Sequence, residues 1–592
     1  MAGLCGIASR ERDDRLGLHL DRMIAAQQDL PWHRSERFVA ASSDLAVGRV
    51  HLGLLPTVAQ GSRWVHGEES DGFVEVQHDP VRRRVTIRND AFGMMPVFYC
   101  HQGGTLIFGT DVKAVLAHPQ VATRLDERGL ADLLAFGFLL GDKTLVRGVR
   151  CLPGGSRLIF DGATGELRQE RAWDFRQKLG RPGANRRATL ERIERAFRQA
   201  VATRCAGEAR PGVSLSGGLD SRTIMAFVDH QKHRLRTLTV DVAGGADRAI
   251  AERIARRTNG LTNHHVVENA ADFFARWPDY VREMVRLTDG MYYDEACVMM
   301  PTLECYREAG IDVVLRGHGG ELARMSEAYE LRVNRHLRAC RTQADLKAQL
   351  FRQMNFAVRE EELGGLLVPE LVAAGGGAAR ASFEEVFAGI DPAWHVVDQV
   401  SCLYAEQYLP RQCVPSLAQL RSRVEVRLPF LDPEYVSAVL ELAPEDRIGS
   451  AIHRYLLERS NPALLHITNA NTGTWAGAPS FVQQASRKGW QILRTYLGYE
   501  RYRHYVDPRG WLKGPLHEAV STILLDRRTA AAGFFEPRAV REKLVAHASG
   551  AADQSATLLL LVYVELWRRM FVEGEARGVA RDAFPELVGR GD

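Results

Sequence analysis

Short apolar runs separated by turn residues mark the first third of the chain. Examples are residues 84–88 (RVTIR), 97–100 (VFYC) and 105–109 (TLIFG), which are bounded by Asp, Gly and a His-Gln-Gly-Gly segment. Runs of this length that are rich in Val, Ile, Phe and Tyr are typical of β-strands joined by tight turns. The pattern therefore predicts a strand-rich first domain over residues 1–172.

The hydrophobic period changes after a charged connector that contains Gly and Pro, over residues 173–187. Beyond it, Leu190, Ile193, Phe197 and Val201 recur at the spacing of one helical face, which indicates an amphipathic helix. We expect this helix to lead into a second domain over residues 188–592.

Apolar runs and helical stretches alternate in the second domain. Residues 212–215, 235–242 and 311–315 are apolar enough for buried strands, while residues 246–257 have helical spacing. Such alternation favours a doubly wound parallel sheet. The Gly-rich tract at 373–379 predicts a loop within a helical region, and the apolar stretch that ends at Trp567 predicts a core helix.

Composition excludes several classes of protein. The 592 residues are 45% hydrophobic and 25% charged, with a net charge of +4, as in an ordinary globular protein with two or three domains. The weak positive balance suits anionic substrates but is too small to indicate a nucleic acid partner. No signal peptide is visible in the sequence, and its longest apolar run is too short to span a bilayer. We therefore expect a cytoplasmic protein without membrane insertion.

Cysteine usage agrees with this location. The nine cysteines are an odd, scattered set without a CxxC pair. That distribution indicates reduced thiols and favours neither a disulfide framework nor a zinc site.

The sequence VSLSGGLDSR at 213–222 carries the clearest chemical signal. It is neither a P-loop nor GxGxxG, yet Ser216, Gly217 and Gly218 follow a strand and allow backbone amides to approach an anion. The helix expected near Asp220 adds the positive end of its dipole. An aspartate beside a phosphate is repulsive unless a divalent cation lies between them, so Asp220 predicts magnesium.

Further motifs accompany SGGLDS in a fixed order: NDAFGMMPVFY at 89–99, TLVRGVRCLPGG at 144–155, LRGHGGE at 315–321 and RLPFLD at 427–432. Together they resemble the asparagine synthetase-like enzymes of the ATP pyrophosphatase group, which cleave ATP to AMP and pyrophosphate. The resemblance implies an α/β protein with ATP and Mg²⁺ as cofactors. It also implies an N-terminal degenerate class II glutamine amidotransferase-like (αββα) domain and a C-terminal doubly wound parallel-sheet ATP pyrophosphatase domain.

The first domain departs from the family where ammonia is produced. Glutamine-hydrolysing members expose a catalytic cysteine whose free α-amine is the base, whereas MAGLCGI places Cys5 four residues inside the chain. The family's HRGPD is reduced to HRSE at 33–36, and its NGEIYN segment is not found. We therefore expect no glutaminase activity and a buried Cys5 that acts as a small hydrophobe.

The resemblance also assigns roles in the second domain. Glu321 is the expected metal partner of Asp220, and His318 stands where asparagine synthetases carry aspartate and β-lactam-forming relatives carry tyrosine. His318 is interpreted either as the base that frees an amine nucleophile or as a hydrogen-bond donor to phosphate, and Glu406 as its acidic partner. Asn471 replaces the family lysine. The expected nucleotide-binding residues are Leu215, Ser216, Gly217, Gly218, Asp220, Ser221, Val240, Arg316 and Gly317, with Arg316 the candidate substitute for the lysine.

These departures are most similar to the lasso peptide macrocyclases. Those enzymes adenylate the side-chain carboxylate of an Asp or Glu in a precursor peptide, and the peptide α-amine then closes an isopeptide bond. The resemblance implies a precursor peptide as substrate, with a leader-peptide-recognition protein and a leader peptidase of the same pathway as partners. Residues 325–400 are expected to help cover the peptide.

Two other classes of function remain open. One is a different amide-forming synthetase, which forms asparagine from ammonia or cyclises a small β-amino acid. The other is a non-catalytic binding protein, against which the intact SGGLDS argues.

Overall fold

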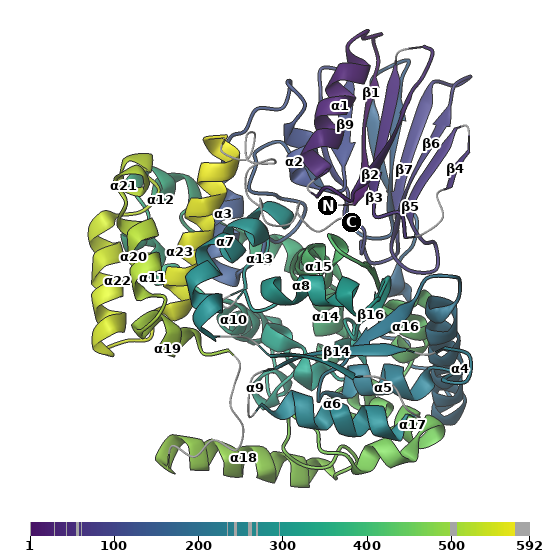
Figure 1. The fold of residues 1–592 in the computed structure, drawn as a ribbon, viewed down its shortest axis with the longest axis vertical. Helices are drawn as coiled ribbons and strands as arrows, with labels where there is room; N and C mark the ends of the chain where they lie inside the picture. The colour runs from purple at the N-terminus through teal and green to yellow at the C-terminus, as the bar shows by residue number, and fades with distance from the viewer. Residues whose placement is uncertain are drawn as a thin grey trace.

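The protein folds into two domains that lie against each other (Figure 1). The computed structural model describes residues 2–574 except 29, 43, 55–57, 61, 234, 242–244, 259–262, 268–269, 295–296 and 498–505. Two antiparallel six-stranded sheets form the first domain, and the second is built around a five-stranded parallel sheet.

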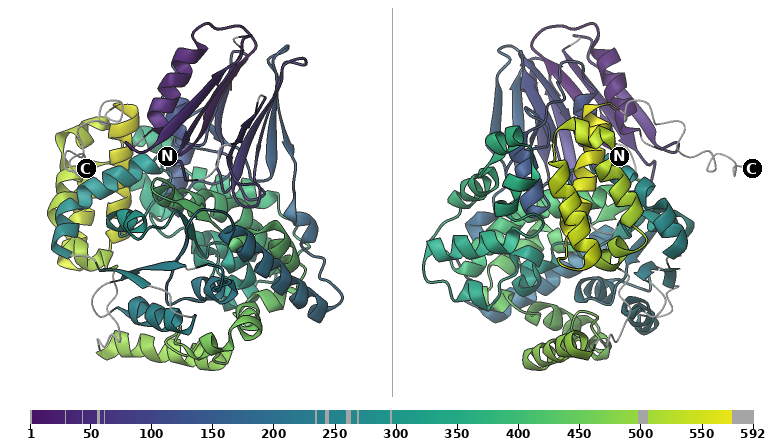
Figure 2. Two further views of the ribbon diagram at one scale, coloured as in Figure 1. Left: turned by 45° about the vertical axis from the view of Figure 1, so that its right-hand side comes forward. Right: turned by 90° about the vertical axis from the view of Figure 1, so that its left-hand side faces the viewer.

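The two sheets of the first domain face each other (Figure 2). One has the strand order β10-β8-β9-β1-β3-β2 and the other β12-β11-β7-β6-β5-β4. The strands of the first sheet are β1 (Gly3–Ser9), β2 (Arg34–Val39), β3 (Leu45–His51), β8 (Phe98–Gln102), β9 (Thr105–Gly109) and β10 (Arg150–Cys151). Those of the second are β4 (Val58–Gln60), β5 (Arg63–Gly67), β6 (Phe73–Asp79), β7 (Arg84–Asn89), β11 (Ser156–Asp161) and β12 (Leu167–Arg171). The predicted strands at 84–88, 97–100 and 105–109 are thus confirmed.

Alternation along the strands builds this core, because every second side chain of a strand points to the same face. Leu4, Val47 and Phe108 from one sheet meet Val76 and Ile87 from the other, and all are buried. Helices α1 (Leu16–Gln27) and α2 (Val112–Leu116) cover the outer face of the first sheet. In the part of the chain that the structure describes, the outer face of the second sheet has no such helical cover, and β7 and β11 alternate between buried and partly exposed residues.

Helix α3 (Glu127–Phe136) also belongs to the first part of the chain. After β12, a connector with one short turn, η1 (Phe175–Lys178), leads to α4 (Arg186–Cys205). The predicted amphipathic face of α4 is buried, and α4 packs against α16 (Pro433–Leu440). The helix expected after the connector is therefore confirmed.

The parallel sheet has the strand order β15-β14-β13-β16-β17. Its strands are β13 (Pro211–Ser214), β14 (Arg236–Asp241), β15 (Asn263–Val267), β16 (Val313–Leu315) and β17 (Glu425–Arg427), and the helices between the first of them are α5 (Leu219–Phe227), α6 (Ala246–Arg257) and α7 (Ala270–Leu287). From β13 the chain adds β14 and β15 on one side, and it then returns to add β16 and β17 on the other side. The order therefore reverses between β13 and β16, where ligands of open α/β sheets bind.

Helices complete the second domain. They are α8 (Leu303–Glu308), α9 (Arg335–Arg338), α10 (Gln343–Met354), α11 (Glu360–Leu366), α12 (Pro369–Gly375), α13 (Ala378–Ala388), α14 (Val396–Leu403), the π-helical η6 (Tyr404–Cys413), α15 (Val414–Arg421), α17 (Ala451–Ser460) and α18 (Ser480–Leu497). The loop predicted at 373–379 is largely wrong, since only Gly376 and Gly377 separate α12 from α13. Gly377, with φ of +72°, makes the break.

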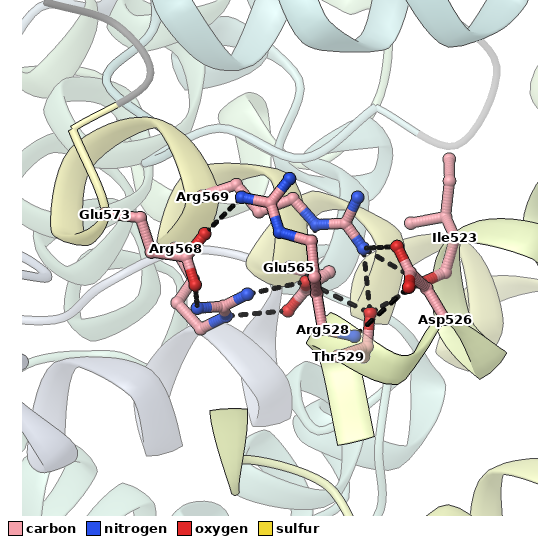
Figure 3. A network of polar contacts seen from close by, with 8 residues as sticks. All are labelled: Ile523, Asp526, Arg528, Thr529, Glu565, Arg568, Arg569 and Glu573. Carbon is pink, nitrogen blue, oxygen red and sulfur yellow. Dashed lines mark hydrogen bonds and ion pairs between the residues drawn. The ribbon is translucent and has the colours of Figure 1, made fainter. Parts of the chain in front are cut away.

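A group of C-terminal helices packs beside the parallel-sheet core (Figure 1). It contains α19 (Pro508–Lys513), α20 (His517–Leu525), α21 (Arg527–Ala532), α22 (Pro537–Ser549) and α23 (Ser555–Trp567). Every residue of α23 except Ala556 is buried, which confirms the predicted core helix. A polar network around Glu565 ties α23 to α21 (Figure 3).

The loop after β5 in the first domain binds the second domain through buried arginines. Arg204, at the end of α4, donates to Asp71 Oδ1 at 2.7 Å and to the Ser70 carbonyl at 2.6 Å. Arg427, at the end of β17, donates to Glu68 Oε1 at 2.6 Å. The domain interface is thus made by charge-assisted hydrogen bonds that include the edge strand of the parallel sheet.

All nine cysteines are free thiols, as their scattered positions predict. None of the helices in the described part of the chain has the length and apolarity needed to cross a membrane.

Candidate nucleotide and metal site

The SGGLDS loop leaves the parallel sheet at β13, next to the point where the strand order reverses. Helix α5 begins at Leu219, so Asp220 lies in its first turn, as expected. Ser221 Oγ accepts from the Ser216 amide at 3.1 Å, and Ser216 Oγ accepts from the Gly218 amide at 3.3 Å. These bonds hold the loop in a tight turn over the positive end of α5.

The neighbouring strand β14 supports the base of this loop. The Leu215 amide donates to the Leu238 carbonyl at 2.9 Å, and Thr239 Oγ1 donates to the Leu215 carbonyl at 2.9 Å. Val240 continues the same strand and is partly buried. Leu215 therefore fixes the start of the loop through its backbone.

The Asn469–Gly473 segment, where relatives carry the lysine, lies against the loop. The buried Arg222 donates to the carbonyls of Gly217, Ile467 and Thr468, and the Ala470 amide donates to the Gly217 carbonyl at 3.1 Å. A Cβ at position 217 would lie 2.7 Å from the Ala470 Cβ, so this approach requires glycine. The side chain of Asn471 is exposed and brings no positive charge.

One amide of the loop already has an acidic partner. The Gly217 amide donates to Asp247 Oδ1 at 2.7 Å, and burial raises the pKa of Asp247. Asp247 lies in the first turn of α6, just beyond β14. Its place just after the neighbouring strand is the signal in the sequence that points to this contact.

The RGHGGE loop follows β16 and contacts Asp220 from the other side of the switch point. A Cβ at Gly317 would lie 2.4 Å from the Asp220 Cβ, and one at Gly320 would lie 2.3 Å from Asp220 Oδ1. The two glycines therefore provide the space in which the aspartate sits. This close approach brings Asp220 and Glu321 into one site, as the sequence predicts.

Glu321 is buried and held in place. Glu321 Oε2 accepts from Tyr404 Oη at 2.8 Å and from the Gly319 amide at 3.2 Å. Burial, together with the charge of Asp220, raises the pKa of Glu321 to about 7. Burial and the neighbouring carboxylate thus both oppose ionisation of Glu321.

Two basic residues that the sequence analysis missed surround Asp220. Arg324 Nη2 donates to Asp220 Oδ2, and His453 Nε2 lies 2.9 Å from Asp220 Oδ1. Burial opposes ionisation of Asp220, but the charge of Arg324 and the hydrogen bond with His453 hold its pKa low, at about 2. His453 reaches the site because α17 packs against α5, and Arg324 because the short turn η3 (Gly320–Ala323) leads it back toward Asp220.

The residues present fit a magnesium ion bound together with phosphates. Among the described residues, no cluster of three or more His, Cys, Asp or Glu side chains could hold a metal alone. Mg²⁺ is usually bound by one or two carboxylates plus substrate phosphates and waters, which is what Asp220 and Glu321 offer beside the loop.

His318 lies in the same loop but is a weak base. Burial, and then the charge of Arg316, lowers the pKa of His318 to about 3. Without ligand, His318 is therefore a weaker base than a free imidazole, and its role as a proton acceptor stays a prediction. Arg316 is partly buried, and its positive charge contributes to the lowered pKa of His318.

The expected pairing of Glu406 with His318 is also wrong. Glu406 Oε1 accepts from Arg176 Nε at 2.7 Å and from Arg171 Nη1 at 3.0 Å. Glu406 therefore binds the end of β12 and the segment that connects the domains. The reason is helical geometry: Glu406 is two residues from Tyr404 on η6, and such residues point in nearly opposite directions. Tyr404 is the residue of this helix that contacts Glu321.

An aromatic row extends from the metal site. The ring of Tyr408 stacks on the rings of Tyr404 and Tyr329, and each pair of ring centroids is 5.6 Å apart. Tyr329 is 50% exposed and has φ of +50°, a strained value for a residue with a side chain. The row therefore leads from Glu321 to the surface through the segment expected to cover a substrate.

The first domain has a cavity of about 560 Å³ at the domain interface. It is lined by Arg49, His51, Gly53, Arg63, Val65, His66, Gly67, Glu68, Glu69, Ser70, Thr203, Ala206, Gly207, Glu425 and Arg427. Cys5 does not line it: the thiol is fully buried in β1, and burial raises the pKa of Cys5 well above its usual value. A thiol in that state is not a nucleophile.

Two family models match parts of this chain. Residues 192–465 match the asparagine synthase family and residues 68–173 match the glutamine amidotransferase domain. A Mycobacterium tuberculosis protein named for the glutamine-hydrolyzing asparagine synthetases is 25% identical over 546 residues, which are 84% of this chain and 76% of that protein.

Two shorter matches have related names. Glutamine-hydrolyzing asparagine synthetase 3 of Bacillus subtilis is 28% identical over 171 residues, covering 28% of this chain and 27% of that protein. The carboxyethyl-arginine beta-lactam-synthase of Streptomyces clavuligerus is 26% identical over 222 residues, covering 35% and 39%.

Proposed function

Because the chain joins a glutamine amidotransferase-like domain to an asparagine synthase domain, we propose that it uses ATP to form an amide bond. A carboxylate oxygen of the substrate attacks the α-phosphorus of ATP, and pyrophosphate leaves. The observation that carries the proposal is the meeting of Asp220 and Glu321 beside the SGGLDS loop at the switch point of the sheet. Bound Mg²⁺ would neutralise phosphate charge there, held by these two carboxylates.

The nucleophile distinguishes this chain from enzymes that use glutamine. Cys5 is followed and preceded by strand residues, has no α-amine, and is fully buried. Cys5 therefore does not release ammonia from glutamine, and the amine comes from solution or arrives as part of the substrate. This supports the finer proposal, ATP-dependent macrocyclisation of a precursor peptide: the peptide α-amine attacks an adenylated Asp or Glu side chain, an isopeptide bond forms, and AMP departs.

His318 would act late in this step. The α-amine of a peptide has a pKa of about 8, so moving its ammonium proton to an imidazole whose pKa is about 3 costs ~7 kcal/mol. The amine must therefore enter neutral. Once its nitrogen bonds the acyl carbon, its remaining protons become acidic, and His318 can accept one as the carbon–oxygen bond to AMP breaks.

The surroundings of the metal pair suit a substrate larger than an amino acid. The row formed by Tyr404, Tyr408 and Tyr329 connects buried Glu321 with the surface. Helices α9 to α13 continue from that row along the chain. Such a surface would hold the amine beside the activated carboxylate and exclude water, and proximity supplies much of the rate of an intramolecular reaction.

An alternative within the same family is favoured by the similarity to asparagine synthetases and to a beta-lactam synthase. In that case the activated carboxylate belongs to free aspartate or to a small β-amino acid. The metal pair and the loop would have the same roles.

Exchange of labelled pyrophosphate into ATP tests which carboxylate is activated. Free aspartate, with and without ammonium, is compared with a linear precursor peptide that has a free N-terminus and an internal Asp or Glu. We expect exchange with the peptide only, and a product that is lighter by one water. Aspartate-dependent exchange with asparagine as product would contradict the peptide proposal.

His318→Ala separates activation from ring closure, with His336→Ala, an exposed histidine, as the control. The variant should keep pyrophosphate exchange, whereas cyclic product should fall by about 10²–10⁴ while AMP is still released by hydrolysis. If exchange and cyclisation fall by the same factor, His318 belongs to the phosphate site instead.

The proposal implies partners as well as a substrate. We propose that a leader-peptide-recognition protein delivers the precursor and that a leader peptidase of the same pathway exposes its α-amine. Cyclisation of a full-length precursor should then require both proteins, whereas a peptide that already has its free N-terminus should cyclise without them.

A further inference from the structure

Arg324 is a buried cation at the edge of the proposed phosphate site. The residue is 5% exposed, and its Nη2 donates to Asp220 Oδ2. Burial opposes the charge of Arg324, but the carboxylates of Asp220 and Glu321 raise its pKa. Its side chain therefore stays charged beside the carboxylates that face the SGGLDS loop.

One nitrogen of this guanidinium has no acceptor. Arg324 Nε is buried without a hydrogen-bond partner. A buried N–H of a charged group that lacks an acceptor is costly, so such groups usually meet an oxygen of a ligand or of the protein. Nε and Nη2 lie on one edge of the guanidinium plane and together match two oxygens of a phosphate group.

Two other arginines belong to these loops. Arg222 is held by backbone carbonyls that fix the Asn469–Gly473 segment, and Arg316 is partly buried and lowers the pKa of His318. Asn471 has no charge. Arg324, in contrast, contacts Asp220 directly.

We propose that Arg324 binds the pyrophosphate portion of ATP through Nε and Nη2, and so provides the positive charge that Asn471 lacks. This inference rests on the ATP site of the proposed function, but not on the peptide substrate. Without nucleotide, Arg324 is the counter-ion of Asp220. When nucleotide enters, Arg324 turns from Asp220 Oδ2 to phosphate oxygens, and this carboxylate oxygen becomes available to Mg²⁺.

Binding of pyrophosphate with Mg²⁺ tests the proposal without any peptide. Calorimetric titration compares the wild type with Arg324→Met, Arg324→Lys and Asp220→Asn, and with Arg332→Met, an exposed arginine of the same segment, as the control. Loss of two charge-assisted hydrogen bonds should weaken binding by about ten- to a hundredfold or more in Arg324→Met. Arg324→Lys should lie between that variant and the wild type, and Arg332→Met should bind within twofold of the wild type.

Thermal melting with Mg²⁺ alone gives a second measurement. Arg324→Met leaves Asp220 without its arginine, so Mg²⁺ should raise the melting temperature of this variant more than that of the wild type. If Arg324→Met does not fold, Arg324→Lys carries the test, since it keeps the charge and loses the two-pronged donor edge.

The outcomes separate this inference from the proposed function. If Arg324→Met binds pyrophosphate like the wild type while Asp220→Asn does not bind, Arg324 is only a counter-ion and the inference is overturned. If the wild type binds and Arg324→Met does not, but peptide never stimulates exchange, the inference stands and the peptide substrate is wrong. If the wild type does not bind magnesium pyrophosphate, both are overturned.

Discussion

Replacement of Glu565 by glutamine tests how the C-terminal helices are held together (Figure 3). Glu565 is fully buried on α23 and accepts from Arg568 Nε and Nη2, each at 2.9 Å, and from Arg569 Nε at 2.6 Å. Thr529 Oγ1 also donates to it at 3.0 Å. This carboxylate therefore contacts two guanidinium groups that are less than 10% exposed, while the more exposed Glu573 and Asp526 contact one each.

The cost of this substitution follows from what it leaves behind. Glutamine has the shape of glutamate, but it is neutral and presents a donor where an acceptor is needed. Removing one partner of a buried ion pair costs about 3–5 kcal/mol because a charge is left uncompensated. Glu573→Gln is the matched control, since Glu573 also contacts Arg568 but is 35% exposed, which limits its effect to about 0–1 kcal/mol.

Hydrogen exchange in the native state is the suitable assay, because a single unfolding free energy is not well defined for a chain with several domains. A loss of 3 kcal/mol corresponds to about 150-fold faster opening. Amides of α20 and α23 should therefore exchange about two orders of magnitude faster in Glu565→Gln than in the wild type, with little change in β13 or β16. Equal acceleration in Glu565→Gln and Glu573→Gln would refute this reasoning and assign the stability of α23 to apolar packing.

The remaining predictions concern the site and the first domain. Asp220→Asn and Glu321→Gln should each abolish AMP formation without changing the circular dichroism spectrum; near-normal turnover in either variant would show that the pair does not serve the nucleotide. Cys5→Ala should form product at the wild-type rate, and the wild type should release no glutamate from glutamine, so a glutaminase activity lost in the variant would restore the amidotransferase reading. Gly320→Ala places a methyl group 2.3 Å from Asp220 Oδ1, so pyrophosphate exchange should fall by at least tenfold, and an unchanged rate would mean that Asp220 can move without consequence.

Elements with a clear hydrophobic period were predictable from the sequence. The helix expected at 246–257 has those bounds, and the apolar face that begins at Leu190 is the buried face of α4. The helical structure of the Gly-rich tract at 373–379 was not predictable, because its composition favours a loop while packing keeps most of its residues helical. Local preference is weak, and contacts made far along the chain override it.

Some residues of the candidate site could be predicted from the sequence, and others could not. Asp220 and Glu321 could be placed together because each follows a strand of one parallel sheet, and the ends of such strands meet at one edge. His453 could not, because it comes from a helix more than two hundred residues beyond Asp220 whose position depends on packing. The pKa of His318 likewise depends on burial and on Arg316, which motif spacing does not reveal.

The contacts between the two domains explain why a first domain with a buried cysteine is still part of the molecule. Arg204 and Arg427 are almost completely buried and are neutralised by Asp71 and Glu68 from the other domain. Without residues 1–172, these cations would lose their partners, and β17 would be left as an uncovered edge strand, a common starting point for aggregation. Exchange of domains between relatives would meet the same difficulty, since a transplanted synthetase half folds well only if its new companion supplies acidic residues at those two positions.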